Sequence, residues 1–170
     1  MTSVRRGILY GVDDTVRDTT HFVLPPGRSH VAELSNRLRA VVDALPLHRG
    51  IRVLEVGCGP GAAAREVARR IGPGHVVGID RSTAAIARAL AGSRAEIEAG
   101  LLSFRRTSVE DFVLEPGETP FDLAFAVRVG AFDGRHPEAG LQAMARLRAA
   151  LVPAGRLLVD GGDPLREVPL

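Results

Sequence analysis

An acidic residue and three alternating glycines stand at the end of an apolar run in the first half of the chain. Glu55 lies within that run, and Gly57, Gly59 and Gly61 follow on alternate positions. Glycines let the backbone turn sharply and let a ligand approach the main chain where no Cβ intervenes. A helical pattern begins directly afterwards, and a helix N-terminus presents unpaired N–H groups. The stretch therefore predicts a buried strand, a tight turn and a helix start beside a bound ligand.

The acid discriminates between two kinds of ligand. The segment from Gly57 to Ala62 also fits the loose dinucleotide pattern G-x-G-x-x-G/A. A carboxylate two residues before the first glycine would repel a pyrophosphate at short range and attract a cationic group. Glu55 therefore favours a ligand that carries positive charge.

The full pattern resembles a known motif. Glu55, Gly57, Gly59 and Gly61 match every fixed position of E-x-G-x-G-x-G, the first motif of the class I S-adenosylmethionine-dependent methyltransferases. Their cofactor carries a sulfonium and an ammonium group and no phosphate, which agrees with the acid. We interpret Cys58, inside the loop, as a small loop residue that contacts the cofactor and not as a nucleophile.

The rest of the chain alternates between helical and strand patterns, and alternation of this kind predicts right-handed crossovers and a parallel sheet. Ser29 and Ser82 are the expected caps of two of the helices. The resemblance implies an α/β fold, a Rossmann-like doubly wound parallel sheet with strand order 3-2-1-4-5. Strands are expected over 51–56, 75–80, 101–107, 121–127 and 156–160, and helices over 29–45, 61–71, 82–98 and around Leu141, Met144, Leu147 and Leu151.

The resemblance also implies a set of cofactor contacts. Asp80 ends the second strand, where the family has an acid that binds the ribose hydroxyls, and two acceptor oxygens suit a vicinal diol. The alternative for Asp80 is a helix cap, but Ser82 is the better cap. Ser108 stands where the family often has an acid for the adenine amino group, with Val109 against the ring and Glu110 or Asp111 as substitutes. Further cofactor contacts are expected from Arg81, Ala126 and Val127.

Residues 128–137 follow the fourth strand and should face the methyl donor, because ligands bind at the carboxyl ends of parallel strands. Methyl transfer depends mainly on orientation, so no fixed catalytic residue is required. A hydroxyl acceptor would benefit from a general base, for which His136 and Asp133 are candidates; the alternative for His136 is a solvated side chain at a helix start. Arg128, at an expected buried strand end, needs a partner, either a substrate carboxylate or Asp133. Asp122, at the start of the same strand, is interpreted as structural.

Composition limits the classes of protein and partner. The 170 residues, with a net charge of +2, predict one domain over 1–170, with an N-terminal arm or lid (1–28) and a core (29–170). Every basic residue is arginine, interleaved with acids, and aromatic residues are few, which argues against nucleic acid. No apolar run reaches the roughly 20 residues of a membrane span, and no signal peptide is evident, so we expect a cytoplasmic protein. One cysteine and scattered histidines predict neither a disulfide nor a metal site.

The C-terminal end departs from the resembling family, which usually adds strands six and seven as an antiparallel hairpin beside strand five. The chain ends soon after Asp160, so we expect that hairpin to be lacking. Strand five would then be an exposed apolar edge, which proteins avoid. We therefore expect either a homodimer partner or the N-terminal arm to cover it.

Three functions remain open from the sequence. The first is methyl transfer from S-adenosylmethionine to a small molecule. The second is a non-catalytic cofactor-binding or accessory subunit, which the altered adenine position allows. The third is a nicotinamide-dependent oxidoreductase, against which Glu55 and the third alternating glycine, Gly61, both argue.

Overall fold

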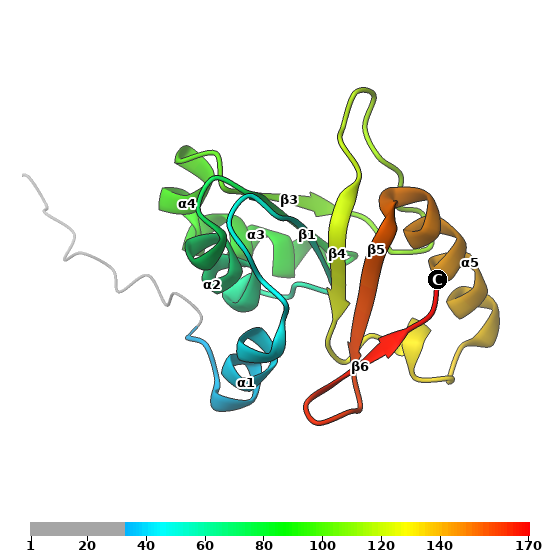
Figure 1. Cartoon of the computed structure of the whole chain (residues 1–170). Helices are drawn as coiled ribbons and strands as arrows, with labels where there is room; N and C mark the ends of the chain where they lie inside the picture. The colour runs from blue at the N-terminus through cyan, green and yellow to red at the C-terminus, as the bar shows by residue number, and fades with distance from the viewer. Residues whose placement is uncertain (1–32) are drawn as a thin grey trace, which may run out of the picture.

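A six-stranded sheet runs through residues 33–170, the part of the chain that the computed structural model describes (Figure 1). The strand order is β3-β2-β1-β4-β5-β6, so the predicted order 3-2-1-4-5 is confirmed with one strand added. The first five strands are parallel to their neighbours, and the sixth is antiparallel to β5. The strands are β1 (Arg52–Val56), β2 (His75–Asp80), β3 (Leu102–Arg106), β4 (Phe121–Ala126), β5 (Leu151–Asp160) and β6 (Leu165–Val168).

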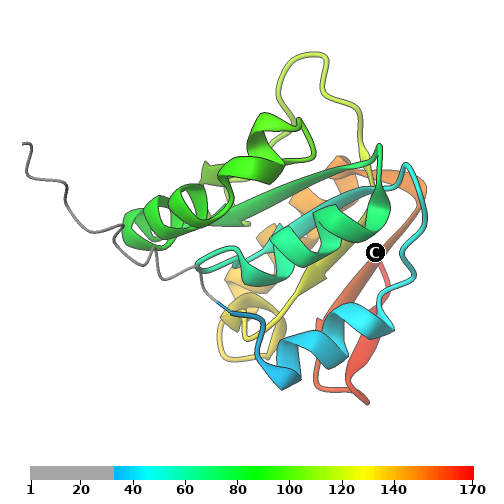
Figure 2. The same cartoon turned by 90° about the vertical axis from the view of Figure 1, so that its left-hand side faces the viewer.

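Helices cover both faces of this sheet, as the doubly wound prediction requires (Figures 1 and 2). One apolar cluster joins α1 and α2 to the sheet through Val41, Val67 and Ile71. The cluster on the opposite face includes Leu147 of α5 and Phe112 of the β3–β4 connection. Central strands buried on both faces explain the nearly continuous apolar runs in the sequence. The helices are α1 (Asn36–Ala44), α2 (Ala62–Ile71), α3 (Thr83–Gly92), α4 (Arg94–Glu98) and α5 (Pro137–Ala150), with a short 3-10 turn, η1 (Gly130–Phe132).

Two predicted helices have different bounds in the structure. The predicted cap Ser29 lies outside the described residues, and α1 begins at Asn36 behind Ser35, whose Oγ accepts a hydrogen bond from the Leu38 N–H. The predicted helix over 82–98 is two helices, α3 and α4, separated at Ser93. Ser93 is fully buried, and its Oγ accepts a hydrogen bond from Arg65 Nη1 at 3.2 Å. The predicted cap Ser82 is confirmed, since its Oγ accepts from the Ala85 N–H.

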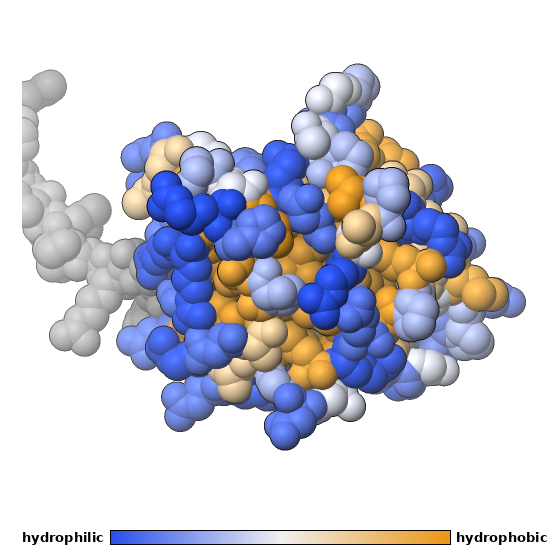
Figure 3. Space-filling model, viewed as in Figure 1, coloured by the Kyte–Doolittle hydropathy of each residue, from blue (hydrophilic) through white to orange (hydrophobic). Residues whose placement is uncertain are grey.

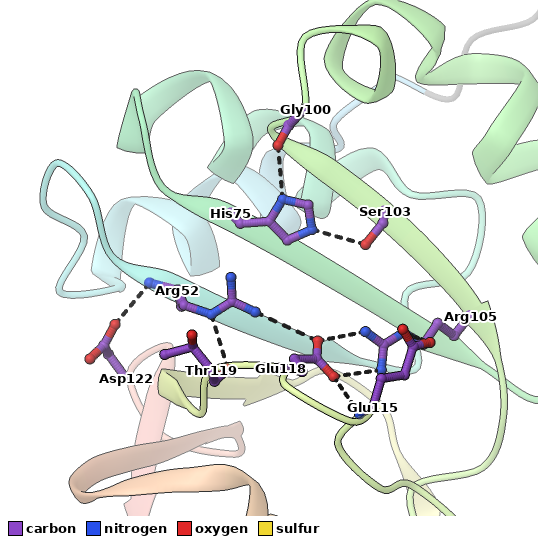
Figure 4. Close-up of polar contacts among 9 residues, drawn as sticks. All are labelled: Arg52, His75, Gly100, Ser103, Arg105, Glu115, Glu118, Thr119 and Asp122. Atoms are coloured by element: carbon purple, nitrogen blue, oxygen red, sulfur yellow. Dashed lines mark hydrogen bonds and ion pairs between the residues drawn. The ribbon is translucent and has the colours of Figure 1, made fainter.

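The β3–β4 connection has no helix, and ion pairs hold it to the sheet (Figure 4). Both carboxylate oxygens of Glu118 accept hydrogen bonds from Arg105 of β3, one of them at 2.9 Å from Nη1. Arg52 of β1 lies 3.6 Å from the same carboxylate. Burial alone would raise the pKa of Glu118, but the bonds from Arg105 and from the Glu115 N–H hold it below its usual value. This anchoring fixes the connection, which begins with the predicted adenine contacts.

His75 and Asp122 make further hydrogen bonds near the amino ends of the strands (Figure 4). His75 bridges the Gly100 carbonyl oxygen and Ser103 Oγ, with both ring nitrogens at 2.9 Å. Asp122 Oδ2 accepts a hydrogen bond from the Arg52 N–H at 2.9 Å, so its predicted structural role is confirmed.

The C-terminal prediction was wrong in its premise. Strand β6 pairs with residues 157–160 of β5, matching Leu157 with Val168, so the apolar carboxyl end of β5 is not a sheet edge. A dimer partner is therefore not needed to cover it. The β5 strand also begins at Leu151, earlier than predicted, and its register with β4 shifts between Phe121 and Leu123.

The surface combines polar flanks with an apolar centre. Seen from the side of Figure 1, apolar surface lies in the middle of the molecule beside β4 and β5, bordered by hydrophilic side chains (Figure 3). On α5, Ala143 and Leu147 are buried against the sheet, whereas Leu141, one of the residues that marked this helix in the sequence, is 74% exposed. None of the helices within residues 33–170 is long and apolar enough to cross a membrane.

Candidate active site

The glycine turn between β1 and α2 forms the centre of the site. Gly57, Gly59 and Gly61 all have positive φ angles, of 71°, 54° and 75°. A Cβ at Gly61 would lie 2.7 Å from Phe104 Cζ, so this glycine lets α2 pack on β3. A Cβ at Gly59 would meet nothing within 4 Å. Gly59 therefore leaves open the space in which a ligand can approach the backbone.

Asp80 ties the end of β2 to this turn. Its Oδ2 accepts a hydrogen bond from the Gly59 N–H at 2.9 Å, and its Oδ1 accepts from the Ser82 N–H at 2.8 Å. Each carboxylate oxygen has a second lone pair, so the side chain retains acceptor capacity for hydroxyl groups.

A cavity of about 370 Å³, here cavity A, opens beside Asp80 at the carboxyl ends of the strands. It brings together six of the predicted cofactor residues with Arg128 and His136. The predicted residues in its wall are Gly57, Asp80, Arg81, Ser108, Val109 and Glu110.

The two residues predicted as substitutes at the adenine position, Glu110 and Asp111, have different surroundings. Ser108 Oγ donates to Asp111 Oδ2 at 2.8 Å and accepts from the Asp111 N–H. Asp111 is thus engaged with Ser108, while Glu110 borders cavity A. Val109 is buried at the inner end of this segment.

A second cavity of about 680 Å³, cavity B, also borders the glycine turn. Glu55, Cys58, Gly59 and Val127 from the predicted set line it. Four residues from the start of α1 and the segment before it complete the wall, and the sequence analysis did not predict them as site residues. These additional residues are Glu33, Ser35, Arg37 and Leu38.

Glu55 is buried, and its Oε2 has no hydrogen-bond partner among the described residues. Burial raises the pKa of Glu55 to about 8, opposed by a hydrogen bond from the Ala64 backbone N–H. An unpartnered buried carboxyl oxygen costs free energy unless a ligand or water satisfies it. Its position in the wall of cavity B points to a donor-bearing ligand there.

Cys58 fits the predicted passive role. Burial, followed by the nearby Glu55 and Asp80 charges, raises the pKa of the Cys58 thiol well above its usual range. The thiol is therefore neutral, and only a thiolate is an effective nucleophile.

Arg128 differs from its predicted state in two respects. Its side chain is exposed, not buried, and Asp133, one of its two predicted partners, binds Arg135 instead. Its backbone adopts φ +58°, unusual for a residue other than glycine, and its N–H donates to Asp160 Oδ1 at 3.1 Å. Arg37 of α1 binds the other oxygen of the same carboxylate at 2.9 Å.

The two candidate bases lie in different cavities. His136 lines cavity A. Asp133 lines a third cavity, cavity C, of about 340 Å³. The hydrogen bonds from Arg135 hold the pKa of Asp133 below its usual value, which weakens it as a base. Cavity C is lined by Arg128, Val129, Phe132, Asp133, Arg135, Asp160, Gly161 and Arg166.

Two predicted cofactor residues line none of these cavities. Gly61 lies under Phe104, and Ala126 is buried in the apolar cluster around α5. Within residues 33–170, no group of three or more His, Cys, Asp or Glu side chains is placed to hold a metal ion.

The glycine turn, the buried acid of β1 and the carboxylate ending β2, carried on this strand order, define the fold of class I S-adenosylmethionine-dependent methyltransferases. A family model described as a methyltransferase domain matches residues 53–155. The chain belongs to this methyltransferase domain family.

Named relatives agree with that assignment. The chain is 36% identical over 138 residues to nocamycin O-methyltransferase of Saccharothrix syringae, covering 79% of this chain and 46% of the relative. It is 32% identical over 123 residues to trans-aconitate 2-methyltransferase of Paracidovorax citrulli, covering 72% and 43%. The solved S-adenosylmethionine-dependent methyltransferase from Thiobacillus denitrificans, in complex with S-adenosyl-L-homocysteine, superposes with a TM-score of 0.58 at 25% identity, covering 75% and 48%. The chain thus spans about half the length of these relatives.

Proposed function

We propose that this chain binds S-adenosylmethionine and transfers its methyl group to a small molecule. The observation that carries the proposal is the unpartnered, buried Oε2 of Glu55 in the wall of cavity B, next to the open face of Gly59. The cofactor carries a cationic amine, which is the group that this buried acid calls for.

The residues present fit the cofactor at three points. The ammonium group supplies the donor that Glu55 Oε2 lacks. The ribose hydroxyls can donate to the remaining lone pairs of Asp80. The adenine ring fits between the apolar side chain of Val109 and the polar edge formed by Ser108 and Glu110 in cavity A.

The chain itself contributes orientation and exclusion of water. Bound S-adenosylmethionine supplies a methyl group on a sulfonium, which an acceptor attacks in line. Gly57 and Arg128 border both cavity A and cavity B, so they lie where the two halves of the cofactor would meet. Holding donor and acceptor in line accounts for most of the rate that such a reaction needs.

A base assists only where the acceptor must lose a proton. We assign that role to His136, because it lines cavity A, whereas Asp133 is held by Arg135 outside it. The name of one relative, an O-methyltransferase, supports oxygen as the acceptor atom.

We also propose that the protein is cytoplasmic and that it forms a homodimer. The dimer no longer follows from the edge of β5, because β6 covers it. Light scattering of the purified protein tests it directly, and a monodisperse monomer would contradict it.

Calorimetric titration with S-adenosylhomocysteine, and separately with NADH, tests the cofactor. Saturable binding of the first alone, weakened in Glu55→Gln and Asp80→Ala, is the expected result. Binding of NADH would favour an oxidoreductase. Binding of S-adenosylhomocysteine without methyl transfer to any acceptor tested would favour the accessory-subunit alternative.

A further inference from the structure

Cavity C gathers three arginines from three separate segments. Arg128 follows β4, Arg135 lies in the loop before α5, and Arg166 belongs to β6. Two acids, Asp133 and Asp160, share the same wall. The balance between these charges decides which ligand the cavity favours.

Both acids are already neutralised. Asp133 binds Arg135 through a hydrogen bond from Nε at 2.6 Å. Asp160 accepts from Arg37 at 2.9 Å and from the Arg128 backbone N–H at 3.1 Å. The local charge that remains is therefore positive.

Two guanidinium groups keep unused donors. Arg166 donates from Nη2 to the Phe132 carbonyl oxygen at 3.1 Å, a neutral partner that leaves its charge uncompensated. Among residues 33–170, the Arg128 guanidinium has neither an ion-pair nor a hydrogen-bond partner. A guanidinium presents a planar fork of donors that matches a carboxylate.

The backbone of Arg128 is held in an unfavourable region. Its φ of +58° is one that glycine and asparagine adopt more readily than arginine. Such conformations persist where the surrounding structure fixes them, and they cluster at ligand sites. Here the Asp160 carboxylate accepts a hydrogen bond from the Arg128 backbone N–H, and Arg128 lines all three cavities.

Cavity C also adjoins the cofactor region. Arg128, Val129 and Arg135 line both cavity A and cavity C. A ligand in cavity C would therefore lie next to the site that we assign to the cofactor.

We propose that cavity C binds a carboxylate group of the methyl acceptor, with Arg128 and Arg166 as the groups that recognise it. This inference rests on the proposed methyl transfer for the role of the ligand as acceptor. The net charge of the wall suits a carboxylate better than a phosphate dianion, because Asp133 and Asp160 remain close to any bound anion.

The test measures carboxylate binding by calorimetry on the protein saturated with S-adenosylhomocysteine. The probes are malonate, succinate and trans-aconitate, with trimethyl trans-aconitate and inorganic phosphate as comparisons. The key variant is Arg128→Asn, because asparagine tolerates the same backbone conformation. Arg148→Gln, an exposed arginine of α5, is the matched control for the loss of one charge.

We expect at least one carboxylate to bind saturably, and Arg128→Asn and Arg166→Gln to weaken it about tenfold, the loss typical of one charge-assisted hydrogen bond. Arg148→Gln should bind the carboxylate like the wild type, and Arg166→Gln, which lies outside cavities A and B, should bind S-adenosylhomocysteine like the wild type. The inference is overturned if no carboxylate binds, if the ester or phosphate binds more tightly, or if Arg128→Asn binds like the wild type. Failure to bind S-adenosylhomocysteine would instead overturn the proposed function, and carboxylate titration of the unliganded protein would still test the anion site.

Discussion

Asp80 and Gly59 are joined by a hydrogen bond of 2.9 Å between the Asp80 carboxylate and the Gly59 backbone N–H. The bond connects the end of β2 with the turn after β1, two segments far apart in the chain. The residue proposed to bind the ribose thus also sets the conformation of the glycine turn.

Replacing Asp80 should therefore affect binding and stability together. Asp80→Ala removes the acceptors of the Gly59 and Ser82 N–H groups, and we expect a loss of about 1–3 kcal/mol in the free energy of unfolding. Binding of S-adenosylhomocysteine should fall by more than tenfold. Urea denaturation and calorimetry measure the two effects. Unchanged stability would contradict the structural half of this prediction.

Alanine substitutions at Gly59 and Gly61 can be compared to separate an effect on ligand binding from an effect on packing. Both have positive φ, so alanine is strained at either position. Only the Gly61 Cβ would collide with Phe104, whereas the Gly59 Cβ would enter open space. We expect Gly61→Ala to unfold at a lower urea concentration than Gly59→Ala, and Gly59→Ala to show the larger loss of cofactor affinity relative to its stability. The reverse order in urea would contradict the packing role.

Glu55 makes the stability of the unliganded protein depend on pH. Burial raises its pKa from an ordinary 4.5 to about 8 in the folded state, so the folded state binds the proton more tightly. The favourable contribution is complete below pH 4.5 and is lost as the pH rises through 8, by up to about 4 kcal/mol. Urea denaturation between pH 5 and pH 8 should show a steeper decline for the wild type than for Glu55→Gln. Parallel profiles would show that Glu55 does not titrate in this range.

The same carboxyl group links ligand binding to proton release. An ammonium group beside Glu55 favours the carboxylate, so binding at pH 7 should expel a proton from the buried acid. The affinity for S-adenosylhomocysteine should then rise between pH 6 and pH 8. Calorimetry in buffers of different ionisation enthalpy measures the released protons. Glu55→Gln should release fewer, and equal release from both proteins would assign the proton to another group.

Asp160 supports Arg128 and α1 at once, through one oxygen for each. Asp160→Ala should weaken carboxylate binding, because it frees the Arg128 backbone. Arg37→Gln removes the ion pair that neutralises Asp160 but keeps the bond to the Arg128 backbone, so it serves as the control. We expect a smaller loss of carboxylate affinity in Arg37→Gln, measured by the titrations described above. Equal losses would indicate that α1, and not the Arg128 backbone, governs this cavity.

Local patterns predicted most of the fold because they follow from burial. Strands covered on both faces are largely apolar, and most residues of β1, β2 and β4 are apolar and buried. The β6 strand escaped prediction because its four residues include Arg166 and Glu167 and carry no continuous apolar run. The break between α3 and α4 depends on the distant Arg65, which binds Ser93, and no local pattern records that contact.

Site residues that belong to the sequence motif could be located from the sequence. Residues whose surroundings depend on tertiary contacts could not. Glu55, Gly59 and Asp80 follow from strand ends and turn geometry, so the motif and the strand pattern located them correctly around the glycine turn. The exposure of Arg128 could not be predicted, because it depends on a backbone conformation held by Asp160. The contribution of Arg37 required knowing how α1 lies against the end of β5.

The anchoring contacts of Arg52, His75 and Asp122 lie at the amino ends of the strands, away from the three cavities at the opposite ends. Residues that stabilise the fold and residues that would determine substrate specificity therefore lie largely at opposite ends of the strands. A library that varies the loop after β4 can consequently explore new acceptors while the anchoring contacts stay intact. This separation makes the domain a practical scaffold for altering specificity.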